Sequence, residues 1–325
     1  MTFYFKQPVF QQLYDRPMAH CATLAQLDDS TLLAAWFGGA FETAPDVAIL
    51  AARWSPVLER WSRPTVIAEV PGKSLGQPVF LPRPDGELWL FYVVNMGADW
   101  TTAQPFWRRS TDRGTTWSAP RQLMDYPGLM FRSRPVVLPG RIILPAYDEN
   151  RWESRMLISD DDGRTWRLGD PIVTPNGNIH ACIVQRSDGL LIAYLRPGVG
   201  GGALWRTTSS DWGDTWTPPT LTDLPNPNSG FDLLRLASGR LALAYNPSAT
   251  LRTPLCVALA DEDERWGPPR MLENDYAEFS YPTLLQAGDG RIHVVYTYRR
   301  EHIHHACFTE SWLSAADAPS AAAVT

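Results

Sequence analysis

The chain has 325 residues, a formal net charge of −6, and 28 proline and 23 glycine residues, a composition that disfavours long helices. The acidic balance, without any block of Lys and Arg, excludes a surface that follows nucleic-acid phosphates, and no apolar run is long enough to predict a membrane span. The first residues, MTFYFKQPVF, lack the apolar core of a secretory signal, so we expect a cytoplasmic protein.

In chain order, the first predicted element is an extended segment over residues 3–11, whose sequence FKQPVFQQL resembles an edge strand because it contains proline. A repeat follows it. Pairs of short apolar runs are joined by turn signals such as Pro139-Gly140 and Asp188-Gly189, and each pair predicts an antiparallel hairpin. After most repeats comes a stretch such as WSAPRQL or WTPPTLT, which is typical of an outer strand.

Tryptophan marks the period of this repeat. Three turns share the pattern Ser-x-Asp-x-Gly-x-Thr-Trp and end at Trp117, Trp166 and Trp216. A degenerate copy ends at Trp266, and Trp61 and Trp312 extend the series at both ends. Six four-stranded units of this kind predict an all-β fold, a six-bladed β-propeller.

We predict one propeller over residues 1–312. Its blades are expected at about 18–70, 76–125, 131–175, 179–223, 230–273 and 279–312. The sixth repeat lacks an outer strand, so residues 3–11 are expected to complete it and close the ring. Residues 313–325 read as a flexible tail because they are rich in alanine.

The repeated turn is the Asp-box, and the chain resembles the sialidase superfamily of six-bladed propellers, most closely its predicted bacterial sialidase-like group. The turn has a structural explanation in each copy, since the aspartate accepts backbone N–H groups and the glycine takes a positive φ. Asp112, Asp161 and Asp211 are therefore not expected to be catalytic.

The chemistry is expected at the opposite end of the blades, which we call the mouth. Each inner strand begins there with a polar residue, although the strand itself is apolar. These six residues are His20, Gln77, Arg134, His180, Asp232 and Tyr281. A ring of polar side chains around one axis predicts a polar binding site.

The loops between the second and third strands add carboxylates and arginines to the mouth. The candidates are Glu42, Asp46, Asp99, Asp148, Glu149, Arg196, Asn246, Arg252, Arg299, Arg300 and His302. Several guanidinium groups at one mouth would bind a carboxylate through paired hydrogen bonds. The sequence therefore predicts a small acidic glycan or oligosaccharide as the partner.

The resemblance implies roles for some of these residues. Tyr281 resembles the tyrosine nucleophile of sialidases, and Asp46 or Glu42 resembles their loop acid/base. Arg134, Arg196 and Arg299 or Arg300 are candidates for the arginine triad, and Glu149 or Glu278 for the glutamate that assists the tyrosine. The chain departs from the family at the first triad arginine, where Met18-Ala-His20-Cys-Ala replaces Phe-Arg-Ile-Pro.

Three functions remain open. In a glycoside hydrolase, Tyr281 would attack an anomeric carbon with a carboxylate as its base. In a lyase, His20 or His180 would remove the C5 proton of a uronic acid while Arg134 neutralises its carboxylate and Tyr281 protonates the leaving group. The third is a glycan-binding propeller without catalysis.

No cofactor is expected, and the sequence does not indicate an oligomeric state. The run His302, His304 and His305 lacks the partner spacing of a catalytic zinc site, so we expect no metal. The four cysteines also lie far apart in the chain, and we expect them to be buried free thiols in a reducing compartment. They are Cys21, Cys182, Cys256 and Cys307.

Overall fold

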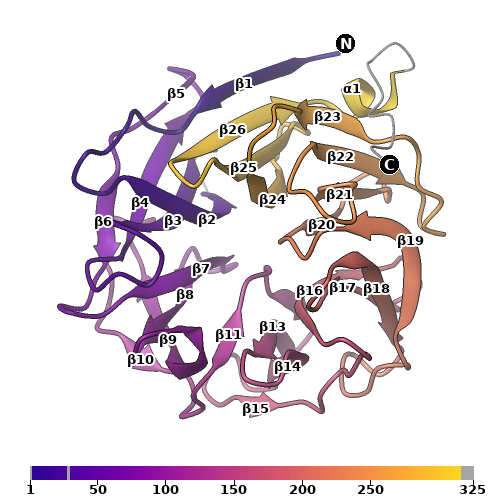
Figure 1. Cartoon of the computed structure of the whole chain (residues 1–325), viewed down its shortest axis with the longest axis horizontal. Coiled ribbons are helices and arrows are strands. Elements are labelled where there is room, and N and C mark those ends of the chain that lie inside the picture. Colours follow the sequence, from indigo (N-terminus) through magenta and orange to yellow (C-terminus); the bar gives the residue numbers. More distant parts are fainter. Residues whose placement is uncertain (1, 28–29, 316–325) are drawn as a thin grey trace.

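The computed structural model describes residues 2–27 and 30–315, and these form six antiparallel sheets arranged around a central axis (Figure 1). Each sheet contains four or five strands, and in five of the six sheets they follow sequence order from the axis outwards; the outer strand of the sixth comes from the start of the chain. The predicted six-bladed β-propeller is therefore confirmed.

The first three blades extend from β2 to β15 in chain order. Blade 1 contains β2 (Met18–Gln26), β3 (Leu32–Gly39), β4 (Ala48–Ser55), β5 (Arg60–Trp61) and β6 (Thr65–Ala68). Blade 2 contains β7 (Leu75–Pro82), β8 (Leu88–Asn95), the short 3-10 helix η1 (Trp100–Thr102), β9 (Ala103–Ser110) and β10 (Arg121–Gln122). Blade 3 contains β11 (Leu129–Phe131), β12 (Val136–Leu138), β13 (Arg141–Asp148), β14 (Glu153–Ser159) and β15 (Arg167–Leu168).

The other three blades have four strands each. Blade 4 contains β16 (Asn178–Gln185), β17 (Leu191–Pro197), β18 (Gly202–Ser209) and β19 (Thr220–Asn226). Blade 5 contains β20 (Asp232–Arg235), β21 (Leu241–Tyr245), β22 (Leu255–Ala260) and β23 (Arg270–Glu273). Blade 6 contains β24 (Phe279–Gln286), β25 (Ile292–Tyr298), β26 (His302–Phe308) and the N-terminal β1 (Tyr4–Pro8).

The ring is closed by the first strand of the chain, as the sequence predicts. β1 pairs antiparallel with β26, from Tyr4 opposite Phe308 to Pro8 opposite His304. Figure 1 shows the two strands side by side at the outer edge of blade 6. Both chain ends thus contribute to one sheet.

The short helix α1 (Glu310–Ser314) reaches two residues into the segment 313–325 that the sequence predicts as a flexible tail. The Thr309 hydroxyl accepts from the Trp312 N–H at the start of this helix. Leu313 is buried against the core of blades 5 and 6, and the Trp312 ring stacks on Tyr4. Burial of these apolar side chains holds the segment in place; residues 316–325 lie outside the described residues.

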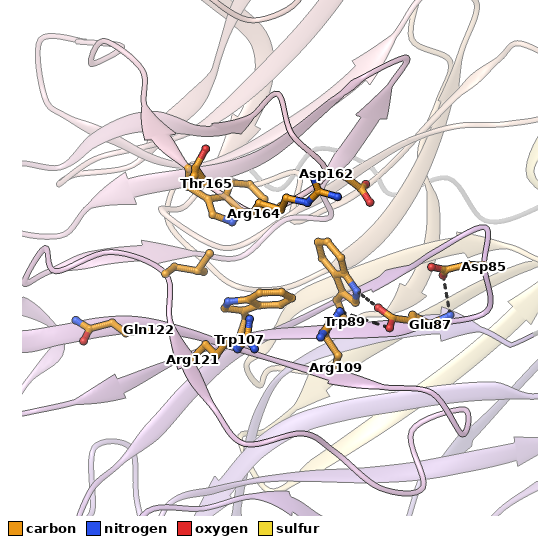
Figure 2. A pocket seen from close by; sticks show the side chains of 13 residues that line it. Asp85, Glu87, Trp89, Trp107, Arg109, Arg121, Gln122, Asp162, Arg164 and Thr165 are labelled. Atoms are coloured by element: carbon orange, nitrogen blue, oxygen red, sulfur yellow. Dashed lines mark hydrogen bonds and ion pairs between the residues drawn. The ribbon is translucent and has the colours of Figure 1, made fainter.

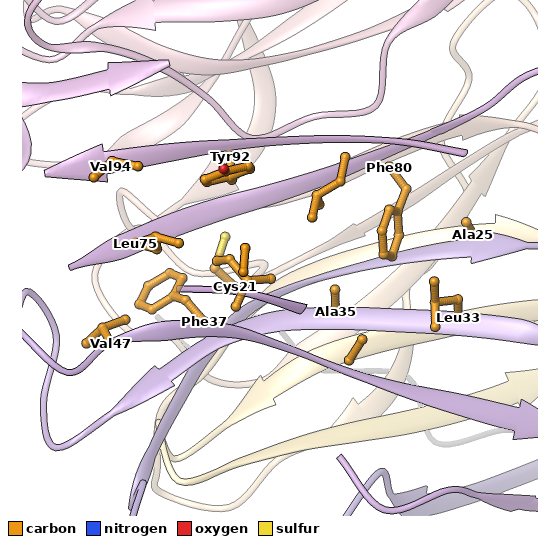
Figure 3. Packing of buried hydrophobic residues seen from close by; sticks show 14 of the residues in the cluster. Cys21, Ala25, Leu33, Ala35, Phe37, Val47, Leu75, Phe80, Tyr92 and Val94 are labelled. Carbon is orange, nitrogen blue, oxygen red and sulfur yellow. The ribbon is translucent and has the colours of Figure 1, made fainter. Parts of the chain in front are cut away.

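Apolar side chains fill the space between neighbouring blades. Between blades 1 and 2, for example, Phe37 and Cys21 pack against Leu75, Phe80 and Tyr92 (Figure 3). These strands are apolar on both faces because each sheet is covered on both sides by its neighbours. All four cysteines are buried and free, as predicted.

The Asp-box turns form as expected at the end of the blades away from the mouth. In blade 3 the Asp161 carboxylate accepts from the Thr165 N–H at 2.8 Å and from the hydroxyls of Ser159 and Thr165 at 2.9 and 2.6 Å. Gly163 has a φ of 79°, as the turn requires. The hydrogen bonds from Thr165 lower the pKa of Asp161 to about 2.

Candidate active site at the mouth of the propeller

Tyr281 lies at the centre of the mouth, on the inner strand of blade 6. Its side chain is 8 % exposed, and its hydroxyl accepts a hydrogen bond from Arg196 Nη1 at 2.9 Å. The guanidinium carbons of Arg132, Arg196 and Arg252 lie 5.6, 5.8 and 5.8 Å from the centroid of its ring. Three cations therefore surround one buried phenol.

A β-bulge sets the direction of Tyr281. The pairing of β24 with β25 slips between Ser280 and Thr283, and Tyr281 takes a φ of 52°. The same slip occurs in the inner strands of three other blades. The residues with positive φ there are Cys21, Gln77 and His180. A bulge re-aims the side chain of the extra residue, here into the channel.

The bulge positions correct the way in which the inner strand of blade 1 was matched to the inner strands of the other blades. We matched His20 to Gln77, His180 and Tyr281, but the equivalent residue is Cys21, which has a φ of 58°. The extra residue of a bulge shifts the strand by one position, and the hydrophobic pattern does not reveal it. His20 precedes the bulge and still faces the site, with its ring centroid 4.4 Å from that of Tyr281.

Two neutral histidines flank the phenol. Burial and the charge of Arg300 hold the pKa of His20 well below its usual value, and burial and Arg196 do the same for His180. His180 Nδ1 faces Arg196 Nη1 at 3.2 Å and so accepts, which leaves its Nε2–H to donate to the Tyr147 hydroxyl at 3.1 Å. Both ring nitrogens of His20 are buried without a hydrogen-bond partner among the described residues.

Arg196 joins these groups. Its side chain comes from the end of β17, is 5 % exposed, and donates through Nη1 to His180 and Tyr281 and through Nε to Asn228 Oδ1 at 2.6 Å. None of these partners carries a negative charge. Its Nη2 has no hydrogen-bond partner within the described ranges, so it can donate to a ligand.

A chain of ion pairs borders the same site. Glu278 accepts from Arg252 Nη1 and Arg300 Nε, both at 2.9 Å. Arg300 also pairs with Glu42, whose other oxygen accepts from Trp100 Nε1 at 3.2 Å. Burial opposes ionisation of Glu278, but its arginine partners hold the pKa of Glu278 below its usual value. Arg252 and Arg300 are therefore partly neutralised within the protein.

Glu149 differs from these carboxylates because it has no such partner. It follows β13 in a loop, and its carboxylate accepts no hydrogen bond from any of the described groups. Burial raises its pKa to about 7, against the lowering charge of Arg196. A carboxyl group with this pKa carries a proton in part of the molecules at neutral pH.

Other predicted site residues lie in the framework. Arg134 pairs with Asp232, and the Asp232 carboxylate also accepts from the Leu284 N–H at 2.7 Å, which ties blades 3, 5 and 6 together. Gln77 Oε1 accepts from the Cys21 thiol at 2.8 Å. These groups bond to one another and to the backbone of the blades, although Arg134 Nε is buried without a partner among the described residues.

Asp46 and Arg299 are not brought into contact with Tyr281. The Asp46 carboxylate is exposed and accepts from the Ala40 N–H at 3.0 Å within its own loop. Arg299 is exposed, and its guanidinium lies 3.8 Å from Asp275. Both side chains hold surface loops in this structure.

Arg132 lies in the site but is not among the residues predicted from the sequence. This residue is 3 % exposed and lies beside the Tyr281 ring. Arg132 and Arg134 are separated by one serine, and Arg134 was matched to the other inner strands because it begins the apolar run RPVVL. The signal that would have found Arg132 is a charged residue directly after the apolar run Leu129–Phe131.

Pockets elsewhere follow the blade repeat. One pocket of 380 Å³ lies between blades 2 and 3 beside the Asp-box turn and is lined by Trp89, Trp107 and Thr165 among others (Figure 2). Pockets next to Trp117 and Trp216 occupy the corresponding places at other blade junctions. Their recurrence marks them as grooves of the fold.

The described residues contain neither a cluster of metal ligands nor a membrane-spanning helix. Over residues 2–27 and 30–315, no group of three or more His, Cys, Asp and Glu side chains is arranged to hold a metal ion. Over the same ranges, no helix has the length and apolar character needed to cross a membrane.

Comparison with known sequences gives a family match and two sialidases. Residues 30–294 match the model of the BNR repeat-like domain. The chain is 24 % identical to a sialidase of Micromonospora viridifaciens, over 93 % of this chain and 53 % of that protein. It is 27 % identical to a sialidase of Clostridium perfringens, over 39 % of this chain and 37 % of that protein. The chain thus spans about half the length of the first of these relatives.

Solved structures are similar over almost the whole chain. A protein of unknown function from Dyadobacter fermentans has a TM-score of 0.79 at 19 % identity, covering 94 % of this chain and 99 % of its own. The intramolecular trans-sialidase from Ruminococcus gnavus, in complex with oseltamivir carboxylate, has a TM-score of 0.78 at 15 % identity and covers 94 % and 98 %. At these identities the likeness establishes the fold alone.

Proposed function

Because the chain belongs to the family of BNR repeat-like domains and is a sialidase-like propeller, we propose that it is a glycoside hydrolase. Its substrate is a sugar that carries a carboxylate, bound at the mouth. The observation that supports this most is the set of three guanidinium groups around Tyr281.

The charges at the mouth favour an anionic ligand. Arg252 and Arg300 share Glu278, whereas Arg132 and Arg196 are buried among neutral partners. Burying a cation among neutral partners is unfavourable, so a bound carboxylate would offset that cost. Arg196 donates to the Tyr281 hydroxyl through Nη1, so its Nη2 would contact a carboxylate bound beside that hydroxyl.

The neighbours of Tyr281 supply acid and base groups. The Tyr281 hydroxyl oxygen attacks the anomeric carbon while its proton passes to neutral His20, and Glu149 gives its proton to the leaving oxygen as that bond breaks. Water then attacks the same carbon and gives a proton to Glu149, and the Tyr281 oxygen leaves and regains its proton from His20. Two displacements at one carbon retain its configuration.

The named relatives support an acidic sugar but do not identify it. Two are sialidases and one structural neighbour is a trans-sialidase. This chain carries His20 where the sialidase motif has its first triad arginine, so its carboxylate contacts would come from Arg196 and Arg252. A different acidic sugar is therefore compatible with the site.

Elimination is the second candidate, and His20 is the observation that favours it. A neutral imidazole with two unpartnered nitrogens is suited to remove the proton next to a uronic acid carboxylate. The C–O bond then breaks, a C=C bond forms in the sugar, and Tyr281 gives its proton to the leaving oxygen.

One experiment separates the two reactions. The protein is incubated with a panel of sialosides and uronic acid glycosides, and both released reducing sugar and ultraviolet absorbance of a conjugated double bond are followed. Hydrolysis predicts reducing sugar without new absorbance, and elimination predicts the absorbance. Tyr281→Phe is expected to abolish either signal, and Arg299→Ala serves as the matched control at the exposed edge.

Binding of acidic glycans without turnover would contradict both hydrolysis and elimination. If acidic glycans bind with measurable affinity and no product forms over the panel, the protein is a glycan-binding propeller. If no acidic glycan binds at all, the assignment of the mouth as a carboxylate site is wrong.

A further inference from the structure

Arg132 crosses the central channel from blade 3 to blade 6. It follows β11, is 3 % exposed, and donates from Nη2 to the carbonyl oxygens of Tyr281 and Pro282 and to the Thr283 hydroxyl oxygen, each at 3.0 Å. The Thr283 hydroxyl in turn donates to the Ala22 carbonyl of blade 1 at 2.7 Å. One guanidinium thus connects three blades directly beneath the phenol.

The groups that Arg132 binds are those of the Tyr281 bulge. Tyr281 and Pro282 lie between the paired residues Ser280 and Thr283, so neither has a partner in the β24–β25 ladder. Their carbonyls therefore need another donor. Within the described residues, the bulges at Cys21, Gln77 and His180 receive no guanidinium at their carbonyls, so Arg132 is specific to the blade that carries the phenol.

The charge of Arg132 is not explained by this structural role. Its hydrogen-bond acceptors are all neutral, and its Nε is buried without a partner. A neutral donor such as an amide would hold the same carbonyls without the cost of burying an unpaired cation. The guanidinium carbon lies 5.6 Å from the centroid of the Tyr281 ring, close enough for its field to act on the phenol.

We propose that Arg132 is a positioning residue that holds Tyr281 in its left-handed backbone conformation and stabilises the negative charge that the Tyr281 oxygen acquires during the reaction. The proposal rests on the proposed reaction of Tyr281. It applies to hydrolysis and to elimination, because the phenol oxygen becomes more negative in both.

The test compares Arg132→Met, Arg132→Lys and a control, Arg83→Met. Arg83 is also largely buried and lies over an aromatic ring, that of Trp89, but it lies away from the mouth. With an active acidic glycoside, we expect Arg132→Met to lower kcat about 100-fold and to change KM less than about threefold, since the charge acts on the transition state. Arg132→Lys should recover kcat to within about tenfold of wild type, because it restores the charge.

Two further measurements are the Tm of each variant and the NMR signal of the Tyr281 ring. Arg83→Met should lower Tm as much as Arg132→Met and leave kcat unchanged. The ring signal of Tyr281 in ¹³C-tyrosine-labelled protein, assigned by its loss in Tyr281→Phe, should shift or broaden in Arg132→Met and stay fixed in Arg83→Met. This readout needs no substrate.

The failures of the two proposals can be told apart. No turnover by the wild-type protein, together with a shifted Tyr281 signal in Arg132→Met, contradicts the proposed function but supports the positioning by Arg132. An unchanged Tyr281 signal, or a kcat of Arg132→Met equal to that of wild type, overturns the role of Arg132. Equal kcat values for Arg132→Lys and Arg132→Met would show that its charge does not contribute.

Discussion

The carboxylates at the Asp-box end and the guanidinium and imidazole groups at the mouth differ in how well their hydrogen bonds are satisfied. At the Asp-box end, Asp161 accepts three hydrogen bonds from residues of its own turn, and Asp112 and Asp211 repeat this pattern in blades 2 and 4. At the mouth, Arg132 Nε and both nitrogens of His20 are buried without partners. The Asp-box arrangement recurs from blade to blade. The indole Nε1 groups of Trp117, Trp166 and Trp216 in those turns are also buried without partners among the described residues, but unpartnered guanidinium and imidazole nitrogens lie together around Tyr281.

This difference indicates where binding energy is available. A carboxylate that accepts hydrogen bonds from its own turn stabilises that turn and has little acceptor capacity left for a ligand. Buried donors without partners gain hydrogen bonds only when something enters the site. The repeated Asp-box turns therefore stabilise the fold, and the candidate active site lies at the other end of the blades, where the residues differ from blade to blade.

The strongest test of this contrast is Arg196→Met. Removing this guanidinium deletes the donor to Tyr281 and the free Nη2 together, so we expect kcat/KM on an active acidic glycoside to fall about 1000-fold. Steady-state kinetics with purified variant and wild type measure it. A loss below tenfold would mean that the mouth does not depend on this arginine.

Glu149→Gln should remove a pH effect. The folded state holds the proton of Glu149 more tightly than the unfolded chain does, so wild-type stability from this group is highest below its ordinary pKa of 4.5 and falls as pH rises towards about 7. At pH 8 the variant should be about 2 kcal/mol more stable than wild type, with little difference at pH 4. Urea unfolding at both pH values measures this.

The same substitution tests Glu149 as the acid. In wild type, kcat should decline above about pH 7 as Glu149 loses its proton. Glu149→Gln should be slow at all pH values and lack this decline. A wild-type profile that stays level through pH 8 would contradict the role.

Asp161→Ala should weaken the framework without touching the reaction. The lowered pKa of Asp161 means that its contribution to stability is present above its ordinary pKa and is lost as pH falls through about 2. We expect Tm at pH 7 to fall by about 3 °C with kcat unchanged. Thermal unfolding followed by circular dichroism, with parallel kinetics, checks both. A large loss of kcat in a folded variant would abolish the contrast between the two ends.

The smallest effect is expected for Arg299→Ala. This arginine was a candidate member of the carboxylate site, but it is exposed and lies 3.8 Å from Asp275. Exposed pairs of this kind contribute little, so activity should change less than about twofold. A larger loss in steady-state kinetics would place Arg299 in the site after all and extend the mouth to the outer loops.

The repeat made the fold predictable, because the Trp period and the turn chemistry are local in sequence. The mouth was predictable as a region, since Tyr281, His20, His180 and Arg196 come from strands and loops that end there. Arg132 was not, because its partners lie about 150 residues away in blade 6. His20 was matched to the other inner strands in place of Cys21, since a bulge adds one residue without changing the apolar pattern.

The pairing of β1 with β26 has a consequence for synthesis of the protein. Residues 4–8 leave the ribosome before the other strands of the propeller, whereas their partner strand is the last strand of the ring to emerge. Blades 1 to 5 can form as the chain grows, but blade 6, which supplies Tyr281, Glu278 and Arg300, is completed only when β26 has been made and pairs with β1. The ring, and with it the site around Tyr281, is therefore complete only when the first and last strands of the propeller have paired.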